Sequence, residues 1–488
     1  MTLLLLTILL PAVAGTASYF IRPHRWRRLL WGTTAALHLA LSVTAALPMN
    51  ATPLDHWIGM DSLSAIFLVL TSLLFLGATV YGIGYVAREP VTGQLDFEDG
   101  SLFKNEPESI FTGAILLLLA AMTLAILSRH LALQWVAIEA TTLASAPLIY
   151  YHQNRRSLEA AWKYLILCSV GIAVALLGIF FIRMTIQDSP HELTLATLLE
   201  RASTLNHKWL STAFIFMLVG YGTKMGLAPM HTWLPDAHSE APSPVSAMLS
   251  GALLNCAFLG ILRVQQICAA AGMASFGGDL LILFGLVSMG LAGVFILRQA
   301  DYKRMLAYSS VEHMGILALG VGLGGLGLFG SLLHAVNHSI VKAMLFLTAG
   351  NILSRFHTKD TTKIQGVRDA LPISGALWIA GFLAVTGSPP FGTFISEFTI
   401  LRAVVDQGRW VVAALYVVFL LLAFVGMAGI VLRMALGRSE VNRVREPLTT
   451  VLSPLVFAVI AILLGVYLPG PLADKLHDAA QLLGGMAK

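Results

Sequence analysis

The sequence contains about fourteen apolar runs of roughly 20 residues, the length at which a helix crosses the hydrocarbon core of a bilayer. Only helices and closed barrels satisfy their backbone hydrogen bonds in lipid, and a barrel would show short alternating segments instead of long runs. The sequence therefore predicts an all-α, multi-pass membrane protein. The approximate cores of the runs are 2–21, 29–48, 59–87, 110–128, 131–151, 160–184, 211–230, 243–268, 277–297, 303–323, 326–354, 373–401, 410–433 and 449–468.

Composition excludes a water-soluble protein. The 488 residues are 57% apolar and 12% charged, with a mean hydropathy of +0.78, whereas soluble domains are about 45–50% apolar and about 25% charged. The net charge of +5 does not indicate nucleic-acid binding, because the basic residues mostly flank the runs. Cys168, Cys256 and Cys268 lie in apolar runs without metal-ligand spacing, so zinc, iron–sulfur and disulfide scaffolds have no support.

The basic residues also predict the orientation of the chain. With the N-terminus placed outside, the inner loops collect about twenty Lys and Arg and the outer loops and termini about nine, Arg263 among them, which predicts both termini outside. The first run has no basic residue before Arg22, so we expect a retained span and not a cleaved signal peptide. No hydrophilic stretch is long enough for a soluble redox or nucleotide domain, so residues 1–488 are predicted to form a single membrane domain.

Two of the runs are interrupted by Gly and Pro. One reads GYGTKMGLAPMHTWLP (220–235) and contains Lys224; the other reads VTGSPPFGTFISEF (385–398) and contains Glu397. Ordinary kinks are common in membrane helices. Two breaks in distant runs, each beside a charge, favour discontinuous helices that line an ion cavity, as in transporters.

Four charged residues cannot be placed in loops: Glu139, Lys224, Lys342 and Glu397. Glu139 lies about eight residues into its run, roughly 12 Å along a helix. An ionised side chain at mid-bilayer costs about 2.5–3.5 kcal/mol even on the lenient insertion scale, so an intramembrane charge is a functional-site hypothesis by default. A buried structural ion pair between Glu139 and Lys224 is the alternative.

His334, His338 and Lys342 are spaced i, i+4, i+8 and therefore share one helical face. Histidines titrate near neutrality and can relay protons, and alignment with a lysine favours that role over satisfied core histidines. Glu312 and His313 are further candidates, although Arg304 lies only eight residues away and the pair could be interfacial.

Asp236, His238 and Glu240, in LPDAHSEAPSP, are expected at the inner mouth of the broken run 211–230. A proton-entry role and a loop-capping role are both open for these three residues. Elsewhere, the chain shows no nucleophile–base constellation, Walker loop or Rossmann glycine pattern. The sequence therefore predicts a proton or cation path and no bond-making centre.

Four stretches carry a resemblance to a known family: KMGLAPMHTWLPDAHSEAPSPVSAMLSG (224–251), DYKRMLAYSSVEHMG (301–315), HAVNHSIVKAMLFLTAGNI (334–352) and GSPPFGTFISEF (387–398). They resemble the antiporter-like subunits of respiratory complex I, Mrp-type antiporters and energy-converting hydrogenases. Within this family, SSVEHMG, LLNCAFLGILR and GSPPFGTFISEF look most like hydrogenase-4 F components, which are membrane subunits of formate hydrogenlyase-type complexes.

The resemblance implies fourteen transmembrane helices, with helices 4–8 (110–270) and 9–13 (275–435) as two inverted five-helix repeats, after an N-terminal part (1–109) and before a last helix and tail (449–488). Helices 7 and 12 would be discontinuous. Where relatives carry a lysine or histidine on helix 8, this chain has Ser250 and Asn255, so the central relay is left to water, the histidines, or Glu312 and His313. The family's fifth-helix glutamate, seventh-helix lysine, eleventh-helix histidines and lysine, and twelfth-helix charge correspond to Glu139, Lys224, His334, His338, Lys342 and Glu397.

The function implied is a proton-translocating subunit of a redox-driven complex in a bacterial or archaeal cytoplasmic membrane. NiFe, iron–sulfur or flavin centres are expected only in partner subunits, and no cofactor or metal in this chain. The expected partners are other antiporter-like membrane subunits, a peripheral redox module and membrane lipid, with no nucleic acid. Two alternatives remain: an Mrp-like Na⁺/H⁺ antiporter subunit, and the membrane anchor of an inorganic-carbon uptake system.

Overall fold

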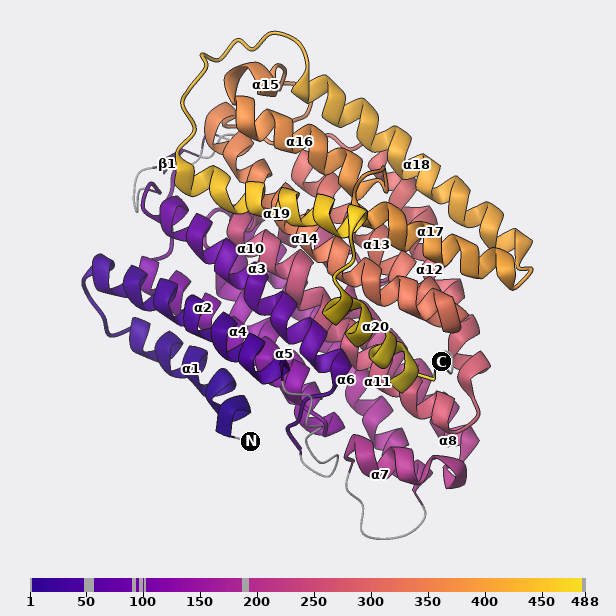
Figure 1. Ribbon diagram of the computed structural model, residues 1–488. Coiled ribbons are helices and arrows are strands. Elements are labelled where there is room, and N and C mark those ends of the chain that lie inside the picture. The colour runs from indigo at the N-terminus through magenta and orange to yellow at the C-terminus, as the bar shows by residue number, and fades with distance from the viewer. Residues whose placement is uncertain are drawn as a thin grey trace.

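The computed structural model describes residues 2–47, 57–89, 94–95, 100, 102–186 and 193–484 (Figure 1). The described part of the chain is mostly helical and contains eleven helical stretches that are long and apolar enough to cross a membrane. This confirms the predicted all-α, multi-pass membrane protein. Position 48, the end of the second predicted run, lies outside the described residues.

The elements follow one another as α1 (Thr2–Ser18), α2 (His24–Ala46), α3 (Ser62–Val86), β1 (Gln94–Leu95), β2 (Leu102–Phe103), α4 (Glu108–Leu127), α5 (Leu131–Ile149), α6 (Arg155–Thr185), α7 (Leu195–Glu200), the 3₁₀ helix η1 (Ala202–Thr204), α8 (His207–Met225), α9 (Trp233–Glu240), α10 (Ser243–Met248), the π-helical segment η2 (Leu249–Leu253), α11 (Leu254–Ala270), α12 (Ala274–Ile296), α13 (Tyr302–Leu323), α14 (Gly325–Phe356), α15 (Val367–Ala370), α16 (Pro372–Val385), α17 (Gly392–Asp406), α18 (Trp410–Ala435), α19 (Leu448–Val466) and α20 (Gly470–Leu482). The strands β1 and β2 pair antiparallel.

Three of the predicted runs are not among the eleven candidate spans. Helix α1 has only 17 residues, α8 carries Lys208 and Lys224 within 19 residues, and the run 373–401 is divided into α16 and α17. Short length, charge and interruption therefore account in turn for the difference between about fourteen runs and eleven candidate spans.

Helix α14 lies at the centre of the bundle. It packs against α13, α16, α17 and α19, and the stretch of α14 that is apolar enough to cross a membrane is wholly buried. Figure 1 shows the helices side by side, with α1 at one edge and α18 at the opposite edge. The central position of α14 brings the face that bears His334, His338 and Lys342 into the interior, away from any lipid.

Both predicted interruptions are present. Helix α8 ends at Met225, where Gly226 caps it with a left-handed φ of 86°, and α9 begins at Trp233. Helix α16 ends at Val385, Gly387 has a φ of 63°, and α17 begins at Gly392. Glycine adopts positive φ at no steric cost, which lets each helix stop inside an apolar run.

The outer helices and the turn that follows α1 expose large apolar side chains. Examples are Phe20 at 80%, Val411 at 74% and Val466 at 73% exposure. Contiguous apolar surface of this kind marks contact with lipid or with other subunits. The polar groups, in contrast, gather inside, along α5, α8, α13, α14 and α17.

Candidate functional site

Glu139 and Lys224 lie close together but do not form a direct ion pair. Among the described residues, the Lys224 Nζ donates to Thr142 Oγ1 at 2.8 Å and to the Tyr164 hydroxyl at 2.6 Å. The Glu139 carboxylate accepts from Ser169 Oγ at 2.7 Å and from Thr142 Oγ1 at 3.4 Å. The Thr142 hydroxyl therefore links lysine to carboxylate, and the structural ion pair considered from the sequence is not what the structure contains.

The end of α8 holds Lys224 in place. Lys224 lies in the last turn of α8, where a cation interacts favourably with the helix dipole. Trp233 Nε1 donates to the Thr223 carbonyl at 2.8 Å, which satisfies one of the carbonyls left free by the break. The Ala228 N–H beyond the break donates to Ser288 Oγ at 2.9 Å. These bonds anchor the interrupted segment on both sides of Gly226.

Lys342 is buried on α14 and faces α13. Its Nζ donates to the Leu306 carbonyl at 2.8 Å and to Ser309 Oγ at 2.7 Å. Two acceptors compensate part of the cost of burying an ammonium group. The predicted common face with His334 and His338 is present, since all three residues are 0% exposed.

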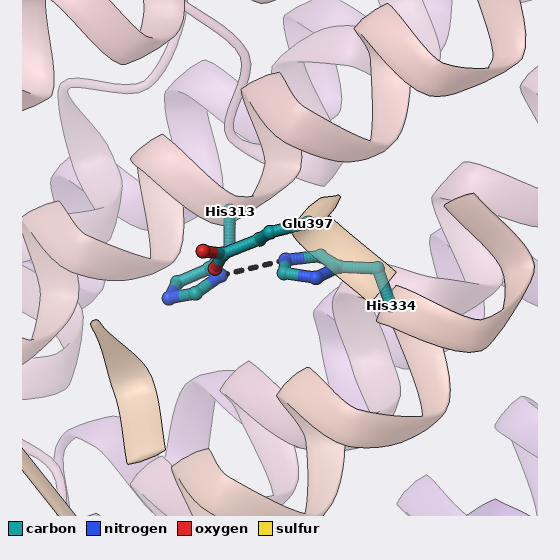
Figure 2. A group of neighbouring side chains, drawn as sticks. All are labelled: His313, His334 and Glu397. Carbon is teal, nitrogen blue, oxygen red and sulfur yellow. Dashed lines mark hydrogen bonds between the residues drawn. The ribbon is translucent and has the colours of Figure 1, made fainter. Parts of the chain in front are cut away.

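His313 joins the histidines of α14 (Figure 2). Its Nδ1 lies 2.8 Å from Nε2 of His334, and its ring centroid lies 4.9 Å from that of His338. His334 Nδ1 lies 2.9 Å from Ser396 Oγ on α17. The next residue, Glu397, places a carboxylate oxygen within 4.8 Å of a ring nitrogen of each of His313 and His334. Three helices thus deliver one cluster.

Glu312 and His313 are therefore not interfacial. They are 4% and 1% exposed, in the interior of α13. The distance of eight residues from Arg304 suggested an interfacial position, but α13 runs more than two turns into the bundle before it reaches them. At this depth in α13, His313 lies within contact distance of His334 and His338.

Where the family resemblance leads one to expect a lysine or histidine on the eighth membrane helix, this chain has a serine on η2 and an asparagine on α11. Ser250 on η2 shares a hydrogen bond of 2.8 Å with Ser310 of α13. Asn255 on α11 donates to Ser339 Oγ of α14 at 2.8 Å. These hydroxyl and amide contacts connect the two halves of the bundle without a charge.

Sequence reasoning missed the hydroxyl groups that contact the charges, namely Thr142, Tyr164, Ser309 and Ser396. Serine and threonine are common in membrane helices, and only a neighbouring helix shows which hydroxyl meets a charge. A usable signal was the position of Thr142 one turn after Glu139, on the same face.

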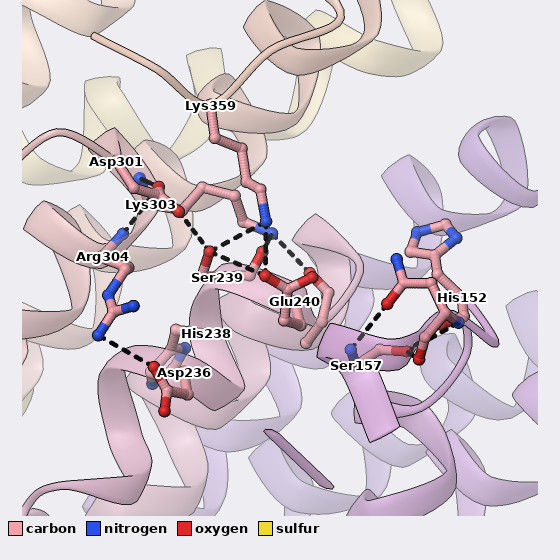
Figure 3. A network of polar contacts seen from close by, with 12 residues as sticks. His152, Ser157, Asp236, His238, Ser239, Glu240, Asp301, Lys303, Arg304 and Lys359 are labelled. Atoms are coloured by element: carbon pink, nitrogen blue, oxygen red, sulfur yellow. Dashed lines mark hydrogen bonds and ion pairs between the residues drawn. The ribbon is translucent and has the colours of Figure 1, made fainter. Parts of the chain in front are cut away.

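Asp236 and Glu240 form ion pairs at the loop side of the bundle (Figure 3). Asp236 contacts Lys163 and Arg304, each at 3.0 Å, and Glu240 contacts Lys359 at 2.6 Å. Burial alone would raise the pKa of Glu240, but the Lys359 ammonium holds the pKa of Glu240 below its usual value. Both carboxylates thus link α9 to the segments around α13 and α14.

Lys303 of α13 also binds the end of α9, whereas His238 packs against a ring of α14. Lys303 Nζ donates to the Ser239 carbonyl at 2.9 Å and to the Ala241 carbonyl at 2.6 Å, at the end of α9. His238 is fully buried, with its ring stacked 5.0 Å from that of Phe346. Of the three residues expected at one mouth, Asp236 and Glu240 therefore form ion pairs, whereas His238 is a buried ring.

A cavity of about 700 Å³ opens beside this network. Its lining includes Arg88, Glu89, His152, Glu240 and Lys303, which come from four separate parts of the chain. Burial lowers the pKa of His152 to about 4, so its imidazole is neutral near pH 7. The cavity brings space for water to within reach of the ends of α9 and α14.

A buried ion pair that sequence reasoning missed joins α3 to α11. Arg263, counted with the outer loops from the sequence, is 1% exposed inside α11, and its Nη1 lies 2.7 Å from Asp61 Oδ2. Burial alone would raise the pKa of Asp61, but the Arg263 guanidinium and the Ser64 N–H lower this pKa to about 2. The carboxylate also caps the first turn of α3 through that N–H.

Comparison with known proteins agrees with this architecture. Residues 128–423 match the family described as NADH:quinone oxidoreductase/Mrp antiporter, TM. The chain therefore belongs to this family of antiporter-like membrane subunits, and the resemblance stated from the sequence motifs is confirmed.

Individual relatives narrow the placement within the family. The chain is 35% identical to a hydrogenase-4 component F homolog from Methylacidiphilum infernorum over 392 residues, 79% of this chain and 81% of the relative. It is 30% identical to hydrogenase-4 component B of Escherichia coli over 387 residues, 76% of this chain and 54% of the relative. It is also 30% identical to NADH-quinone oxidoreductase subunit N of Desulforudis audaxviator over 371 residues, 75% of this chain and 70% of the relative.

Solved structures share the fold. A chain of the archaeal membrane-bound sulfane sulfur reductase superimposes with a TM-score of 0.87 at 21% identity, covering 99% of this chain and 98% of that one. A chain of the Mrp complex from Dietzia sp. gives 0.85 at 21% identity, covering 98% and 97%. A chain of respiratory complex I from Thermus thermophilus gives 0.81 at 24% identity, covering 99% and 100%.

Proposed function

We propose that the chain is the proton-translocating membrane subunit of a redox-driven complex, either of the group 4 hydrogenase (formate hydrogenlyase) type or like NADH:quinone oxidoreductase. The observation that carries this proposal is the series of protonatable side chains that begins at the half-buried Glu139 and continues inside the bundle to Glu397. Each intramembrane charge costs about 2.5–3.5 kcal/mol, and a proton path accounts for all of them together.

The proposed architecture has fourteen membrane crossings, with both termini outside. Adding α1, α8 and the α16–α17 pair to the eleven candidate spans gives that number. Residues 1–109 would form the N-terminal helices, 110–270 and 275–435 the inverted repeats, and 449–488 the last helix and tail. The presence of one broken helix in each proposed repeat supports this division.

The first half of the path runs from Glu139 to Lys224. Thr142 accepts a hydrogen bond from the lysine and donates one to the carboxylate, so a single hydroxyl rotation reverses the direction of the proton relay. Tyr164 offers the lysine a second acceptor. A proton held on Lys224 is therefore stabilised without a direct ion pair.

The second half runs from Lys342 through the histidines to Glu397. Ser309, which accepts from Lys342, neighbours Ser310, which contacts Ser250 of η2, so water near η2 would complete the central step. His338, His313 and His334 follow, and the contact of His334 with Ser396 leads to Glu397. Imidazoles suit this role because each carries a donor and an acceptor nitrogen.

The driving reaction is proposed to take place in partner subunits. NiFe, iron–sulfur or flavin centres would belong to a peripheral redox module, and other antiporter-like membrane subunits would flank this chain in a bacterial or archaeal cytoplasmic membrane. The exposed apolar side chains of α18 and α19 provide surface for lipid or such neighbours. The family match and the multisubunit complexes that contain the structural neighbours support this assignment.

Replacement of Lys224 or Glu139 by alanine tests the proposal. In proteoliposomes that contain the assembled complex, coupled proton translocation should be lost while the complex still forms and its partners still transfer electrons. Acidification is followed with an entrapped pH indicator, and assembly by co-purification. Full pumping by either variant would contradict the proposed path.

An Mrp-like Na⁺/H⁺ antiporter subunit is the second candidate, favoured by the TM-score of 0.85 with a chain of an Mrp complex. Sodium-dependent changes of internal pH in vesicles that hold this chain alone would support it. Co-purification separates the remaining readings. A NiFe-hydrogenase large subunit or an NADH-oxidising module would support the redox complex, and a carbonic-anhydrase-like partner would support an anchor for inorganic-carbon uptake.

A further inference from the structure

The cluster of His313, His334 and Glu397 has the composition of a transition-metal site. One ligand atom from each side chain lies within 4.8 Å of the other two, and all three residues are buried. Figure 2 shows the side chains converging from α13, α14 and α17, with the Glu397 carboxylate beside the His313 ring. We propose that these three residues bind a divalent transition-metal cation of the zinc class.

Glu397 provides an independent reason to expect a cation. The residue is 7% exposed, and its Oε1 has no hydrogen-bond partner among the described residues. A buried carboxylate oxygen without a partner is costly in the ionised form, and either a proton or a bound cation removes that cost. A cation bound between the carboxylate and the two imidazoles would offset this penalty.

The contact with Ser396 prepares His334 to act as a ligand. Ser396 Oγ lies 2.9 Å from the Thr393 carbonyl oxygen and 2.9 Å from Nδ1 of His334. When the hydroxyl donates to the carbonyl, the contact with His334 is a hydrogen bond from Nδ1–H of the histidine. The Nε2 of His334 then presents its lone pair toward His313. A ring N–H held by a polar partner is the usual arrangement behind a metal-binding histidine.

The donor set selects the metal class. Two imidazole nitrogens and one carboxylate oxygen are typical of zinc sites that keep a fourth position open, whereas Mg²⁺ and Ca²⁺ prefer oxygen ligands. Tetrahedral ligands at about 2.1 Å from zinc stand about 3.4 Å apart. The present separation of His313 Nδ1 from His334 Nε2, 2.8 Å, needs only a small opening, because metal binding replaces their hydrogen bond.

The segment between α16 and α17 is partly exposed and lies next to this cluster. Gly387, which is partly exposed, lies so close to Glu397 that a Cβ on it would stand 1.9 Å from Oε2. Pro389 and Pro390 of the same segment are exposed. This partly exposed segment therefore lies against the carboxylate, and the cation would approach from its side. On the proposed function, its binding would also interrupt the step from His313 to His334.

Co²⁺ titration of the full-length chain, purified in detergent, tests the site. Tetrahedral Co²⁺ gives strong visible absorption, and zinc should displace it with a 1:1 stoichiometry. H334A and E397Q should each weaken binding by more than the roughly 10–100-fold expected for S396A, which removes only the second-shell partner. H477A on exposed α20 and D406N on α17 serve as matched controls and should bind as the wild type does.

Several results would overturn the site: no tetrahedral spectrum from the wild-type chain, or wild-type affinity in both H334A and E397Q. Retention of the elution volume and melting temperature in S396A shows that its weaker binding is not caused by unfolding. Because binding is measured without turnover, the site stands or falls separately from proton translocation. Zinc inhibition of proton flux in wild type, at the zinc concentration that displaces Co²⁺, would connect the two.

Discussion

Replacing Thr142 by valine removes the hydroxyl that links Lys224 to Glu139 and keeps the shape of the side chain. The lysine would lose its 2.8 Å acceptor and keep the Tyr164 hydroxyl as its one acceptor in the described part of the chain, and the carboxylate would lose its 3.4 Å donor. A hydrogen bond to a charged group contributes about 1.5–3 kcal/mol, and each 1.36 kcal/mol changes a rate about tenfold. We therefore expect proton translocation to slow by roughly 10- to 100-fold.

The measurement is the initial rate of proton uptake by proteoliposomes per electron transferred through the assembled complex. Thr142→Ser keeps the hydroxyl and should retain most of the rate. Thr141→Val is the matched control, because among the described residues the hydroxyl of Thr141 contacts only the Ile138 carbonyl of its own helix. If T142V translocates protons as fast as T141V, the hydroxyl link has no role in the path.

Two further predictions concern the second break and the buried ion pair. Gly387→Ala should slow proton translocation strongly, because a Cβ would displace the Glu397 carboxylate and a left-handed conformation costs an L-residue about 1–2 kcal/mol; a wild-type flux in this variant would show that the position of the carboxylate is unimportant. The lowered pKa of Asp61, about 2, contributes about 2 kcal/mol of stability that is complete above the unfolded-state pKa of about 4. This contribution should be lost as the pH falls toward 2, so the melting temperature of wild type should fall over that range more steeply than that of Asp61→Asn. Arg263→Met should lower stability at pH 7 by about 3 kcal/mol, seen as a lower melting temperature with unchanged helix content.

Much of the fold could be predicted from the sequence because burial in lipid imposes a simple rule. Long apolar runs must become helices, and a Gly/Pro interruption must end them. Both breaks, at Gly226 and Gly387, were predicted for this reason. The difference between about fourteen runs and eleven candidate spans arises where a helix is short, carries charges or is interrupted.

The site residues were predicted less evenly. Charges such as Lys342 are conspicuous because they are expensive in lipid, so scarcity alone pointed to them. Arg263 was assigned to a loop, since its proximity to the end of a run resembles an interfacial position, and its partner Asp61 comes from a helix about 200 residues earlier. A partner so distant along the chain leaves no local signal.

The sequence by itself determined that this chain is a helical membrane protein, which two of its long runs are broken, and that a few charges, Lys342 among them, lie inside the bundle. These properties depend on apolar length, backbone freedom and the cost of burying charge, and all three are local. Only the tertiary structure decided that Thr142 separates Lys224 from Glu139 and that His313 meets His334 and Glu397. These contacts depend on how separate helices pack, and packing is set by the fit of whole surfaces.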